Sequence, residues 1–333
     1  MSRRIAVILF NLGGPDSLPA VRPFLFNLFN DPAIIGLGQP WRWMLAQFIS
    51  RRRERTARAI YQQMGGRSPI LELTEEQARA LQTDLEKDFD VRVFSCMRYW
   101  HPRAEEVLEK VDRFDPETVV LLPLYPQFST TTTGSSFREW LTLQRDKSWK
   151  TLKVFSYHDD EAFIACHQEM IGSYLQDLEP GTYRLLFSAH GLPEKIIAAG
   201  DPYQRQVEEC AAAIAAGLSN LEDWRVCYQS RVGPMKWIGP STEEEIHRAA
   251  GEGKDIVIVP VAFVSEHSET LVELDVEYRE LAEKAGIGRY IRVPALGTRP
   301  CFIAALGTLI RRTVTAGHDT GKDEDNLVNG PSS

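Results

Sequence analysis

The sequence predicts a doubly wound α/β protein with two similar lobes and a cleft between them. Short apolar runs alternate with longer helical patterns along the chain, and this alternation is typical of parallel α/β folds. The runs are apolar at nearly every position, as in strands that helices cover on both faces of a parallel sheet. The chain has 333 residues, and at about 150 residues per domain this length suits two domains.

Four strands are expected in each half of the chain. In the first half the strand candidates are residues 5–10, 91–95, 118–122 and 152–155. In the second half they are residues 183–187, 225–228, 255–259 and 290–293. Helical periodicity between these runs predicts helices at 74–87, 103–113, 161–178, 203–218 and 266–284. The first strand is followed by Gly13 and Gly14, which allow a tight turn or a close backbone approach.

The order of these elements places the domain boundaries. We expect a first lobe at residues 1–157, which includes an apolar lip, and a second lobe at 158–301. A last helix at 302–315 is expected to pack back on the first lobe. The tail at 316–333 is polar and rich in Gly, Asp, Asn and Ser, which predicts disorder.

Composition excludes several classes of protein. Asp and Glu number 46 against 38 Lys and Arg, a net charge of −8, and this argues against a nucleic-acid binder because phosphate contacts require a basic face. No apolar run approaches the ~20 residues of a membrane helix, so we expect the chain in the cytoplasm. The five cysteines are scattered without a Cys-x-x-Cys pair, which predicts buried thiols in a reducing compartment.

One histidine stands where ligands bind in open α/β sheets. His190 follows the apolar run at 183–187 and precedes Gly191, and ligands of such folds lie at the carboxyl ends of strands. An imidazole there can transfer protons near neutral pH or bind a borderline metal. A purely structural or surface histidine is the alternative.

A second candidate is the acidic helix that follows the next strand of the second lobe. In an α-helix Glu269, Glu273 and Glu277 step only ~40° apart and form one stripe of carboxylates. No Lys or Arg lies three or four residues after Glu269 or Glu273 to pair with them. Such a stripe suits passage of a cation or relay of protons, and a solvated charged face is the alternative. His267 and Glu269 make a weak metal pair by themselves. If a metal is bound, the more plausible partner of Glu269 is His190, from another strand end of the same lobe.

Aromatic and apolar residues are crowded near the N-terminus. They are Phe24, Leu25, Phe26, Leu28, Phe29, Ile34, Ile35, Trp41, Trp43, Met44, Phe48 and Ile49, followed by Arg51, Arg52 and Arg53. The segment is either a core helix or an apolar lip for a large flat ligand or a membrane surface. In the second case the arginines would meet carboxylates or lipid head groups.

Longer motifs make the chain resemble the ferrochelatases, which insert ferrous iron into a porphyrin to complete haem. The motifs are Leu12-Gly-Gly-Pro15, Gly65-Gly-Arg-Ser-Pro69, Arg98-Tyr-Trp-His-Pro102, Tyr125-Pro-Gln-Phe-Ser129 with Thr132-Thr-Gly-Ser-Ser136, Ser188-Ala-His-Gly-Leu-Pro193, Gly200-Asp-Pro-Tyr203, the run from Tyr228 to Pro240, and the helix from His267 to Tyr278. They occur in family order. The resemblance implies two Rossmann-like lobes, each with a four-stranded parallel sheet flanked by helices, and an active-site cleft between them.

The resemblance also implies roles for particular residues. His190 and Glu269 match the catalytic pair and metal ligands of the family, on either side of the macrocycle. Glu273 and Glu277 match an acidic path for protons or metal, in a helix that the family partly widens to π geometry. Positions near the macrocycle are matched by Leu12, Arg98, Tyr99 and Trp237, and positions that contact its propionates by Arg53, Tyr61 and Ser68. We therefore expect the imidazole and the carboxylate to face each other through the gap where the tetrapyrrole lies.

The implied reaction joins protoporphyrin IX and Fe²⁺ to form protohaem and releases two protons. His190 would accept pyrrole protons or hand iron to the ring. A chelatase for coproporphyrin III and a carrier of haem or porphyrin without chemistry are the alternatives. No cofactor beyond the substrate iron is expected. The [2Fe–2S] cluster of some members is not expected either, because Thr130 stands at its internal cysteine position and no cysteine follows Cys301.

For partners, the resemblance implies protoporphyrin IX and ferrous iron as substrates and no nucleic acid. The expected location is the cytoplasm, with peripheral contact to the inner membrane as a further possibility through the lip segment at 41–49. The sequence predicts neither the oligomeric state nor the iron donor.

Overall fold

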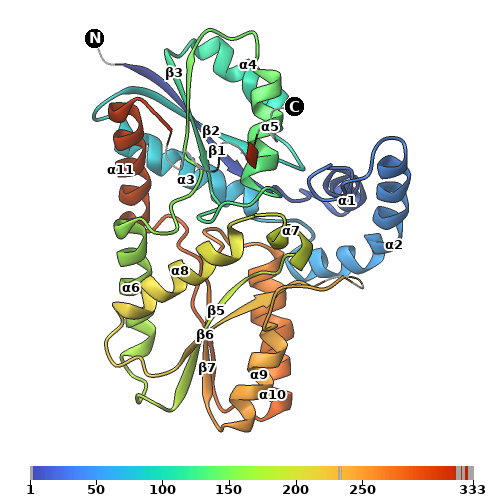
Figure 1. Cartoon of the computed structure of the whole chain (residues 1–333), viewed down its shortest axis with the longest axis vertical. Helices are drawn as coiled ribbons and strands as arrows, with labels where there is room; N and C mark the ends of the chain where they lie inside the picture. The colour runs from blue at the N-terminus through green and yellow to red at the C-terminus, as the bar shows by residue number, and fades with distance from the viewer. Residues whose placement is uncertain (1–2, 232, 234, 320–323, 325–326, 329–333) are drawn as a thin grey trace. The chain divides into compact units, whose positions relative to one another are not determined.

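The computed structural model contains two units, each built on one parallel sheet (Figure 1). It describes residues 3–231, 233, 235–319, 324 and 327–328. The first unit comprises Met1–Ser156 and Ile303–Ser333, and the second comprises Tyr157–Phe302. The chain therefore passes from one unit to the other twice, before Tyr157 and after Phe302.

The sheet of the first unit has the order β2-β1-β3-β4, and all its strands are parallel. The strands are β1 (Arg4–Asn11), β2 (Asp90–Met97), β3 (Thr118–Pro123) and β4 (Lys150–Lys153). The helices are the short 3-10 helix η1 (Leu18–Ala20), α1 (Val21–Phe29), α2 (Trp41–Gln63), α3 (Ile70–Leu85), α4 (Ala104–Phe114), α5 (Thr133–Leu143) and most of α11 (Pro300–Ala316). The strand order reverses between β1 and β3, which is where ligands bind in such sheets.

The sheet of the second unit repeats this arrangement with the order β6-β5-β7-β8. Its strands are β5 (Tyr183–His190), β6 (Trp224–Gln229), β7 (Asp255–Pro260) and β8 (Tyr290–Arg292). Its helices are α6 (Glu161–Leu175), α7 (Glu194–Ala198), α8 (Tyr203–Ala216), α9 (Thr242–Gly251), the π-helix η2 (Glu269–Glu277) and α10 (Tyr278–Ala285). The reversal lies between β5 and β7, so the loops after these two strands diverge at the carboxyl edge of the sheet.

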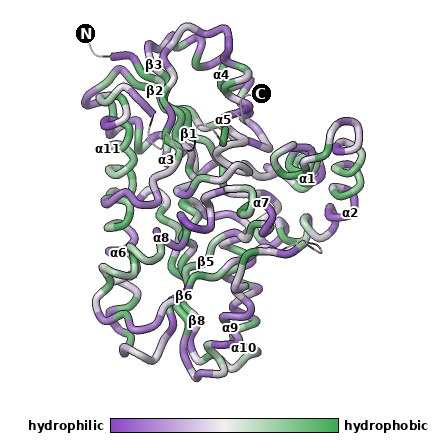
Figure 2. The backbone as a smooth tube through the Cα atoms, in the orientation of Figure 1, coloured by the Kyte–Doolittle hydropathy of each residue, from purple (hydrophilic) through white to green (hydrophobic). Residues whose placement is uncertain are grey.

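The predicted α/β fold with two four-stranded parallel sheets is confirmed. Each of the eight apolar runs overlaps one observed strand, and the central strands are hydrophobic along most of their length in Figure 2. Helix α9 was not among the predicted helices, although its N-terminus carries a capping motif. Ser241 accepts a hydrogen bond from the amide of Glu244, whose carboxylate accepts one from the amide of Ser241.

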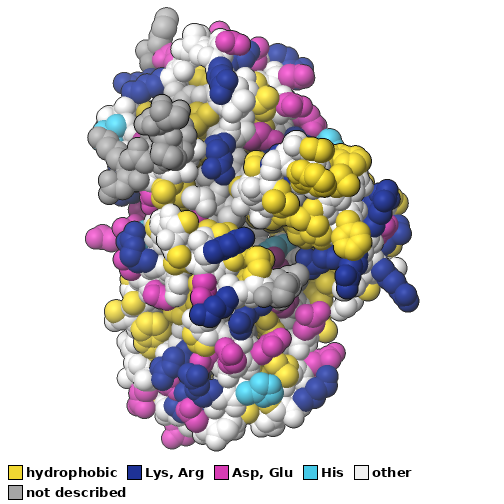
Figure 3. All heavy atoms as spheres, turned by 45° about the vertical axis from the view of Figure 1, so that its right-hand side comes forward, with side chains coloured by type: hydrophobic (Ala, Val, Ile, Leu, Met, Phe, Trp, Pro, Cys, Tyr) yellow, Lys and Arg dark blue, Asp and Glu magenta, His cyan; other side chains and the backbone are white. Residues whose placement is uncertain are grey.

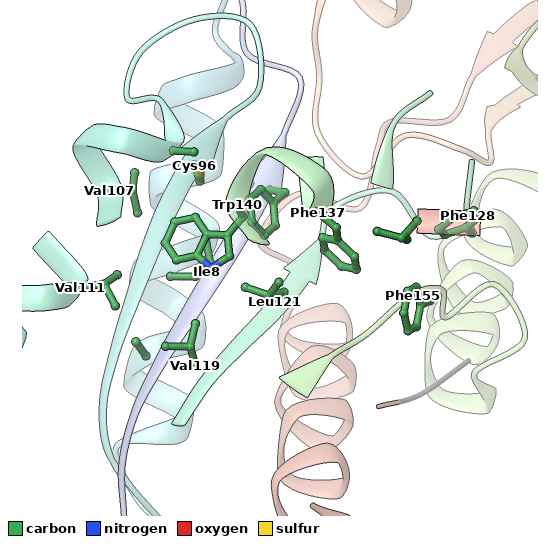
Figure 4. Packing of buried hydrophobic residues seen from close by; sticks show 14 residues of the cluster. Ile8, Cys96, Val107, Val111, Val119, Leu121, Phe128, Phe137, Trp140 and Phe155 are labelled. Carbon is green, nitrogen blue, oxygen red and sulfur yellow. The ribbon is translucent and has the colours of Figure 1, made fainter. Parts of the chain in front are cut away.

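The core of the first unit shows why these runs form strands. Ile8 of β1 and Leu121 of β3 are fully buried in one cluster with Phe137 and Trp140 of α5 (Figure 4). The ring of Phe10 meets that of Trp140 edge-on, with 5.9 Å between centroids. Side chains of this size exclude water from the sheet face, and burying each contributes about 1.5–3 kcal/mol.

The C-terminal segment contacts the first unit. In α11, Arg311 pairs with Asp84 at 2.8 Å and with Asp88 at 2.7 Å, both from the region of α3. Beyond the helix, the side chain of Asp319 accepts a hydrogen bond from the amide of Lys153 at 2.8 Å, and Val328 is fully buried in the core cluster. These described residues differ from the expected disordered tail at 316–333, and the rest of that tail lies outside the described residues.

The expectation of reduced cysteines is wrong for two of the five. Cys166 of α6 and Cys301 of α11 form a disulfide, with their Cα atoms 5.7 Å apart. Cys96, Cys210 and Cys227 are free and buried. The bond joins the beginning of the second unit to its end. Spacing could not reveal this pair, because the two residues are 135 positions apart and meet only through tertiary packing.

His167 of α6 gives a pH dependence that can be measured. Both its ring nitrogens are buried without a hydrogen-bond partner among the described residues, and burial lowers the pKa of His167 to about 3. Its pKa in the unfolded chain is about 6.5, so between these values only the unfolded state binds the proton. The free energy of unfolding should therefore fall below pH 6.5. In urea titrations at pH 7 and pH 5, we expect wild type to lose about 2 kcal/mol more than His167→Leu. Equal losses in the two proteins would contradict this.

Candidate active site

Two predicted site residues meet at the carboxyl edge of the second sheet. His190 is the last residue of β5, and Glu269 begins the π-helix that follows the neighbouring strand β7. The Nδ1 atom of His190 lies 2.9 Å from Oε2 of Glu269, a hydrogen bond from imidazole to carboxylate. The two residues expected to act together are therefore in direct contact, while their role as metal ligands stays a prediction. Their side chains are 37% and 25% exposed, so a ligand can reach both.

The expectation that these two groups face each other through a gap is wrong. A separation of 2.9 Å leaves no space for a macrocycle between the imidazole and the carboxylate. The physical reason is topological: His190 ends β5, Glu269 follows the adjacent strand β7, and both therefore lie at the same edge of one sheet.

The electrostatics of the pair favour an imidazolium and a carboxylate. Burial by itself lowers the pKa of His190, but the charge and hydrogen bond of Glu269, with a contribution from Glu273, outweigh it and raise that pKa. Burial likewise raises the pKa of Glu269, yet the charge and hydrogen bond of His190, helped by His267, hold it well below its ordinary range. A proton that reaches this pair is therefore held on the imidazole.

Glu273 occupies a different environment from Glu269. Its carboxylate accepts hydrogen bonds from Gln229 Nε2 at 3.1 Å, from the amide of Ser230 at 2.8 Å, from the hydroxyl of Ser230 and from the hydroxyl of Tyr278 at 3.0 Å. Burial and the nearby charge of Glu269 nevertheless outweigh these bonds and raise the pKa of Glu273. This group takes up a proton more readily than an ordinary glutamate does.

The helix that carries these carboxylates has the π geometry that the resemblance implied, over Glu269–Glu277. Glu269 and Glu273 are half-buried, whereas Glu277 is exposed. The three residues therefore run from the histidine pair toward solvent and do not form the uniform α-helical stripe that the spacing predicts.

Trp237 is held beside the same strand end. It bridges Pro193, which follows His190 by three residues. A Cβ atom added to Gly191 would lie 3.4 Å from the Trp237 ring, so the indole packs directly on this backbone. Its indole nitrogen is buried without a hydrogen-bond partner in the described part of the chain.

Most of the remaining predicted residues lie together in the first unit. Tyr61 of α2 and Tyr99 after β2 are buried in one cluster, against which Leu12 packs. The amide of Tyr99 donates to the carbonyl of Leu12 at 3.0 Å. Leu12 follows β1, so the cluster lies at the carboxyl edge of the first sheet.

Ser68 and Arg53 occupy separate positions in this unit. A Cβ atom on Gly14 would lie 2.5 Å from the Cβ of Ser68, so glycine is required where the loop after β1 passes this serine. The predicted close backbone approach at Gly14 is therefore observed. The guanidinium of Arg53 lies 5.7 Å from the ring centre of Phe29, within cation–π range.

The guanidinium of Arg98 is fully engaged by the protein. It donates from Nε to Ser135 at 2.8 Å and from Nη1 to Glu139 at 3.0 Å, and its Nη2 lies 2.9 Å from Asp31. The hydroxyl of Tyr99 donates to the same Asp31 oxygen at 2.8 Å. Burial and the charge of Asp31 raise the pKa of Tyr99, which keeps its hydroxyl protonated.

Sequence reasoning missed three residues that organise these sites. Asp31 orients Arg98 and Tyr99, and Gln229 and Ser230 hold Glu273. The signal for the last two was available, because Gln229 ends β6, Ser230 follows it, and both therefore lie at the same sheet edge as His190. The role of Asp31 depends on contacts with residues 67 and 68 positions away, which no local pattern shows.

The aromatic segment near the N-terminus divides into a core part and an exposed part. Phe24 and Leu25 of α1 are buried, whereas Trp41 and Phe48 of α2 are 66% and 60% exposed. Together with the exposed Trp43 and Met44 they form the apolar lip, and hydrophobic side chains gather over α1 and α2 in Figure 3. Across the described residues, no helix has the length and apolar character needed to cross a membrane.

Among the residues that the structure describes, no group of three or more His, Cys, Asp or Glu side chains is arranged to hold a metal ion. His190 and Glu269 place an imidazole and a carboxylate, both possible metal ligands, side by side.

Comparisons with known proteins agree with these observations. A family model described as ferrochelatase matches residues 4–314. A ferrochelatase from Caulobacter vibrioides is 56% identical over 318 residues, which cover 94% of this chain and 91% of that protein. A ferrochelatase from a Wolbachia strain of Drosophila simulans is 53% identical over 310 residues, covering 91% and 98%. The solved structure of SirB from Bacillus subtilis with Fe³⁺ is 12% identical with a TM-score of 0.55, covering 93% and 95%, and this likeness shows the fold alone.

Proposed function

The chain belongs to the ferrochelatase family, and from this premise we propose how its residues insert ferrous iron into protoporphyrin IX to form protohaem. The enzyme is a metal chelatase, a lyase, and iron is its substrate. The reaction must remove two pyrrole protons, strip water from the ion and turn a nitrogen lone pair out of the ring plane. The observation that carries the residue assignment is the 2.9 Å contact of His190 with Glu269.

His190 is the proposed proton acceptor. Because Glu269 raises the pKa of His190, the imidazole must first pass its proton to the acidic residues of the π-helix. The neutral imidazole then takes a pyrrole proton, and Glu269 stabilises the imidazolium that results. Handing iron to the ring would require the same neutral imidazole, so both tasks use one protonation state. In either case His190 and Glu269 would contact the same face of the macrocycle.

The acidic residues of the π-helix would carry protons away. Glu273 has a raised pKa and lies near Glu269, so it is suited to receive a proton. Glu277 is exposed and gives the proton a way to solvent. Iron that enters along the same carboxylates would move in the opposite direction, from the solvent at Glu277 toward His190.

This path gives a graded prediction. Glu273→Gln should slow metal insertion by roughly tenfold, because it removes one relay group and leaves His190 and Glu269 in place. Glu277→Gln is the matched control at the exposed end of the path. Its insertion rate should fall less than that of Glu273→Gln. Initial rates of zinc insertion without oxygen measure both variants. A Glu273→Gln rate equal to that of wild type would count against the path.

The porphyrin contacts are proposed from the resemblance. They are Leu12, Arg53, Tyr61, Ser68, Arg98 and Tyr99 on the first unit and Trp237 on the second. Leu12 and Trp237 are half-buried apolar surfaces next to strand ends, which suits contact with a flat ring. We assign Arg98 and Tyr99 to shaping this surface, because Asp31, Ser135 and Glu139 already engage their polar atoms.

No resident cofactor is needed for this chemistry, because the iron enters and stays ferrous. The absence of a [2Fe–2S] cluster stays a prediction from the sequence. We place the enzyme in the cytoplasm, with peripheral attachment to the inner membrane through the apolar lip.

Vesicle binding tests the proposed attachment. Replacing both Trp41 and Phe48 by glutamine should weaken binding to anionic lipid vesicles by roughly tenfold or more, because two large exposed side chains no longer enter the interface. Met235→Gln removes an exposed apolar side chain elsewhere and serves as the control. Equal sedimentation of all three proteins with vesicles would refute attachment through the lip.

Insertion rates without oxygen test the proposed function. Protoporphyrin and coproporphyrin III are each mixed with Fe²⁺ and the protein, and the absorption bands of the metalated product are followed. We expect the protein to accelerate insertion and to favour protoporphyrin. Preference for coproporphyrin would change the substrate, and the uncatalysed rate with both porphyrins would leave only a carrier.

A further inference from the structure

The end of the π-helix leaves one backbone carbonyl without a partner in the helix. The amide of Tyr278 donates to the carbonyl of Glu273, five residues earlier. The α-helix α10 begins at Tyr278, and in α geometry the amide of Arg279 is placed to donate four residues back, to Asp275 and not to Leu274. The spacing between amide donor and carbonyl acceptor therefore changes from five residues to four at this point. As a result, no helical amide donates to the carbonyl of Leu274.

A tyrosine of strand β8 supplies a hydrogen-bond donor to this carbonyl. The hydroxyl of Tyr290, the first residue of β8, donates to the carbonyl of Leu274 at 2.8 Å. Tyr290 is buried and packs in one core cluster with Leu274 and Tyr278. Burial raises the pKa of Tyr290, so its hydroxyl remains a donor. A buried carbonyl without a donor is costly, and this bond removes that cost in the π form.

A second residue of β8 ties the same helix. Arg292 lies 2.7 Å through Nε from Asp275 and 2.8 Å through Nη1 from Glu266. Asp275 lies within the π-helix, and Glu266 precedes it. Strand β8 therefore contacts the π-helix at two residues, Leu274 and Asp275. In this register Glu269 is hydrogen-bonded to His190 and Glu273 to Ser230.

In an α-helical register the amide of Tyr278 would donate to the carbonyl of Leu274, and the Tyr290 hydroxyl would have to share this acceptor with it. In the π form the hydroxyl replaces the missing amide donor and has the carbonyl to itself. The hydrogen bond therefore stabilises the π form more than the α form. The same change of register would re-aim the carboxylates, because the residues of a wider turn are displaced around the axis.

We propose that Tyr290 is a positioning residue for metal insertion, whose hydroxyl fixes the π register that aims Glu269 and Glu273. Tyr290 itself touches neither substrate nor reacting atoms. The effect on rate rests on the proposed function, whereas the effect on helix register does not.

Tyr290→Phe tests this, because it removes the hydroxyl and keeps the ring in the core cluster. Tyr157→Phe is the control, since the Tyr157 hydroxyl is buried in the same unit with no hydrogen-bond partner among the described residues. For Tyr290→Phe we expect kcat for zinc insertion into protoporphyrin to fall roughly threefold to tenfold, the effect of losing one buried hydrogen bond. KM for protoporphyrin should change little. Amide hydrogen exchange should accelerate by a similar factor across residues 274–280 and stay unchanged in β5 and β7.

The outcomes separate the two proposals. Unchanged kcat and unchanged exchange in Tyr290→Phe would overturn the positioning role. Faster exchange throughout the second unit together with a rate loss would also overturn it, since the hydroxyl would then support the fold as a whole. If wild type shows no insertion above the uncatalysed rate, the proposed function fails, and local exchange alone still decides whether Tyr290 fixes the register.

Discussion

Replacing His190 by alanine is expected to slow iron or zinc insertion by roughly 10²- to 10⁴-fold, the usual contribution of a positioned general base. The variant should still bind porphyrin, because the imidazole is partly exposed and its hydrogen-bond partner in the structure is Glu269. Glu269→Gln should show a loss of similar order, since a neutral amide no longer stabilises the imidazolium. Single-turnover absorption changes with protein in excess measure the chemical step.

Two comparisons make this result interpretable. His247→Ala removes an exposed histidine from α9 in the same unit and should keep the wild-type rate. Porphyrin fluorescence titrations show whether the slow variants still bind substrate. A rate within twofold of wild type for both His190→Ala and Glu269→Gln would remove the pair from the mechanism.

Replacing Arg184 by methionine should cause the largest loss of stability. Arg184 is 2% exposed at the beginning of β5, with Asp223 at 2.9 Å and Glu252 at 2.6 Å. Fully buried Glu245 lies 3.8 Å away. Removing the cation breaks the buried pair, while Lys254 at 2.6 Å from Asp223 and Arg248 at 2.8 Å from Glu245 remain. We therefore expect a cost at the lower end of the about 3–5 kcal/mol of a broken buried ion pair. Urea unfolding at pH 7 measures the change in the free energy of unfolding.

A neighbouring arginine provides the control for this variant. Arg225 contacts the same Asp223 at 3.4 Å, but its side chain is 49% exposed. Arg225→Met should therefore cost at most about 1 kcal/mol, because solvent screens an exposed pair. Similar losses in the two variants would show that burial does not set the strength of this network.

The fold was predictable because its determinants are local. Apolar runs such as residues 5–10 and 255–259 specify strands covered on both faces, and helical periodicity between them requires parallel crossovers. The position of His190 was predictable for the same reason, since a residue after a buried strand must lie at the carboxyl edge of its sheet.

The parts that sequence could not supply depend on contacts between distant residues. The direct contact of His190 with Glu269 follows from the pairing of β5 with β7, which no local pattern fixes. The Cys166–Cys301 bond requires that the two ends of the second unit meet. The choice between a core helix and an apolar lip required the three-dimensional structure, which exposes Trp41 and its neighbours, because both alternatives need the same composition.

The most direct measurement is a crystal structure of the complex with metal-free protoporphyrin IX. We expect His190 and Glu269 on the same face of the macrocycle, still hydrogen-bonded to each other, with the free imidazole nitrogen directed at a pyrrole nitrogen. A macrocycle that lies between the imidazole and the carboxylate, or that binds away from both, would contradict this account.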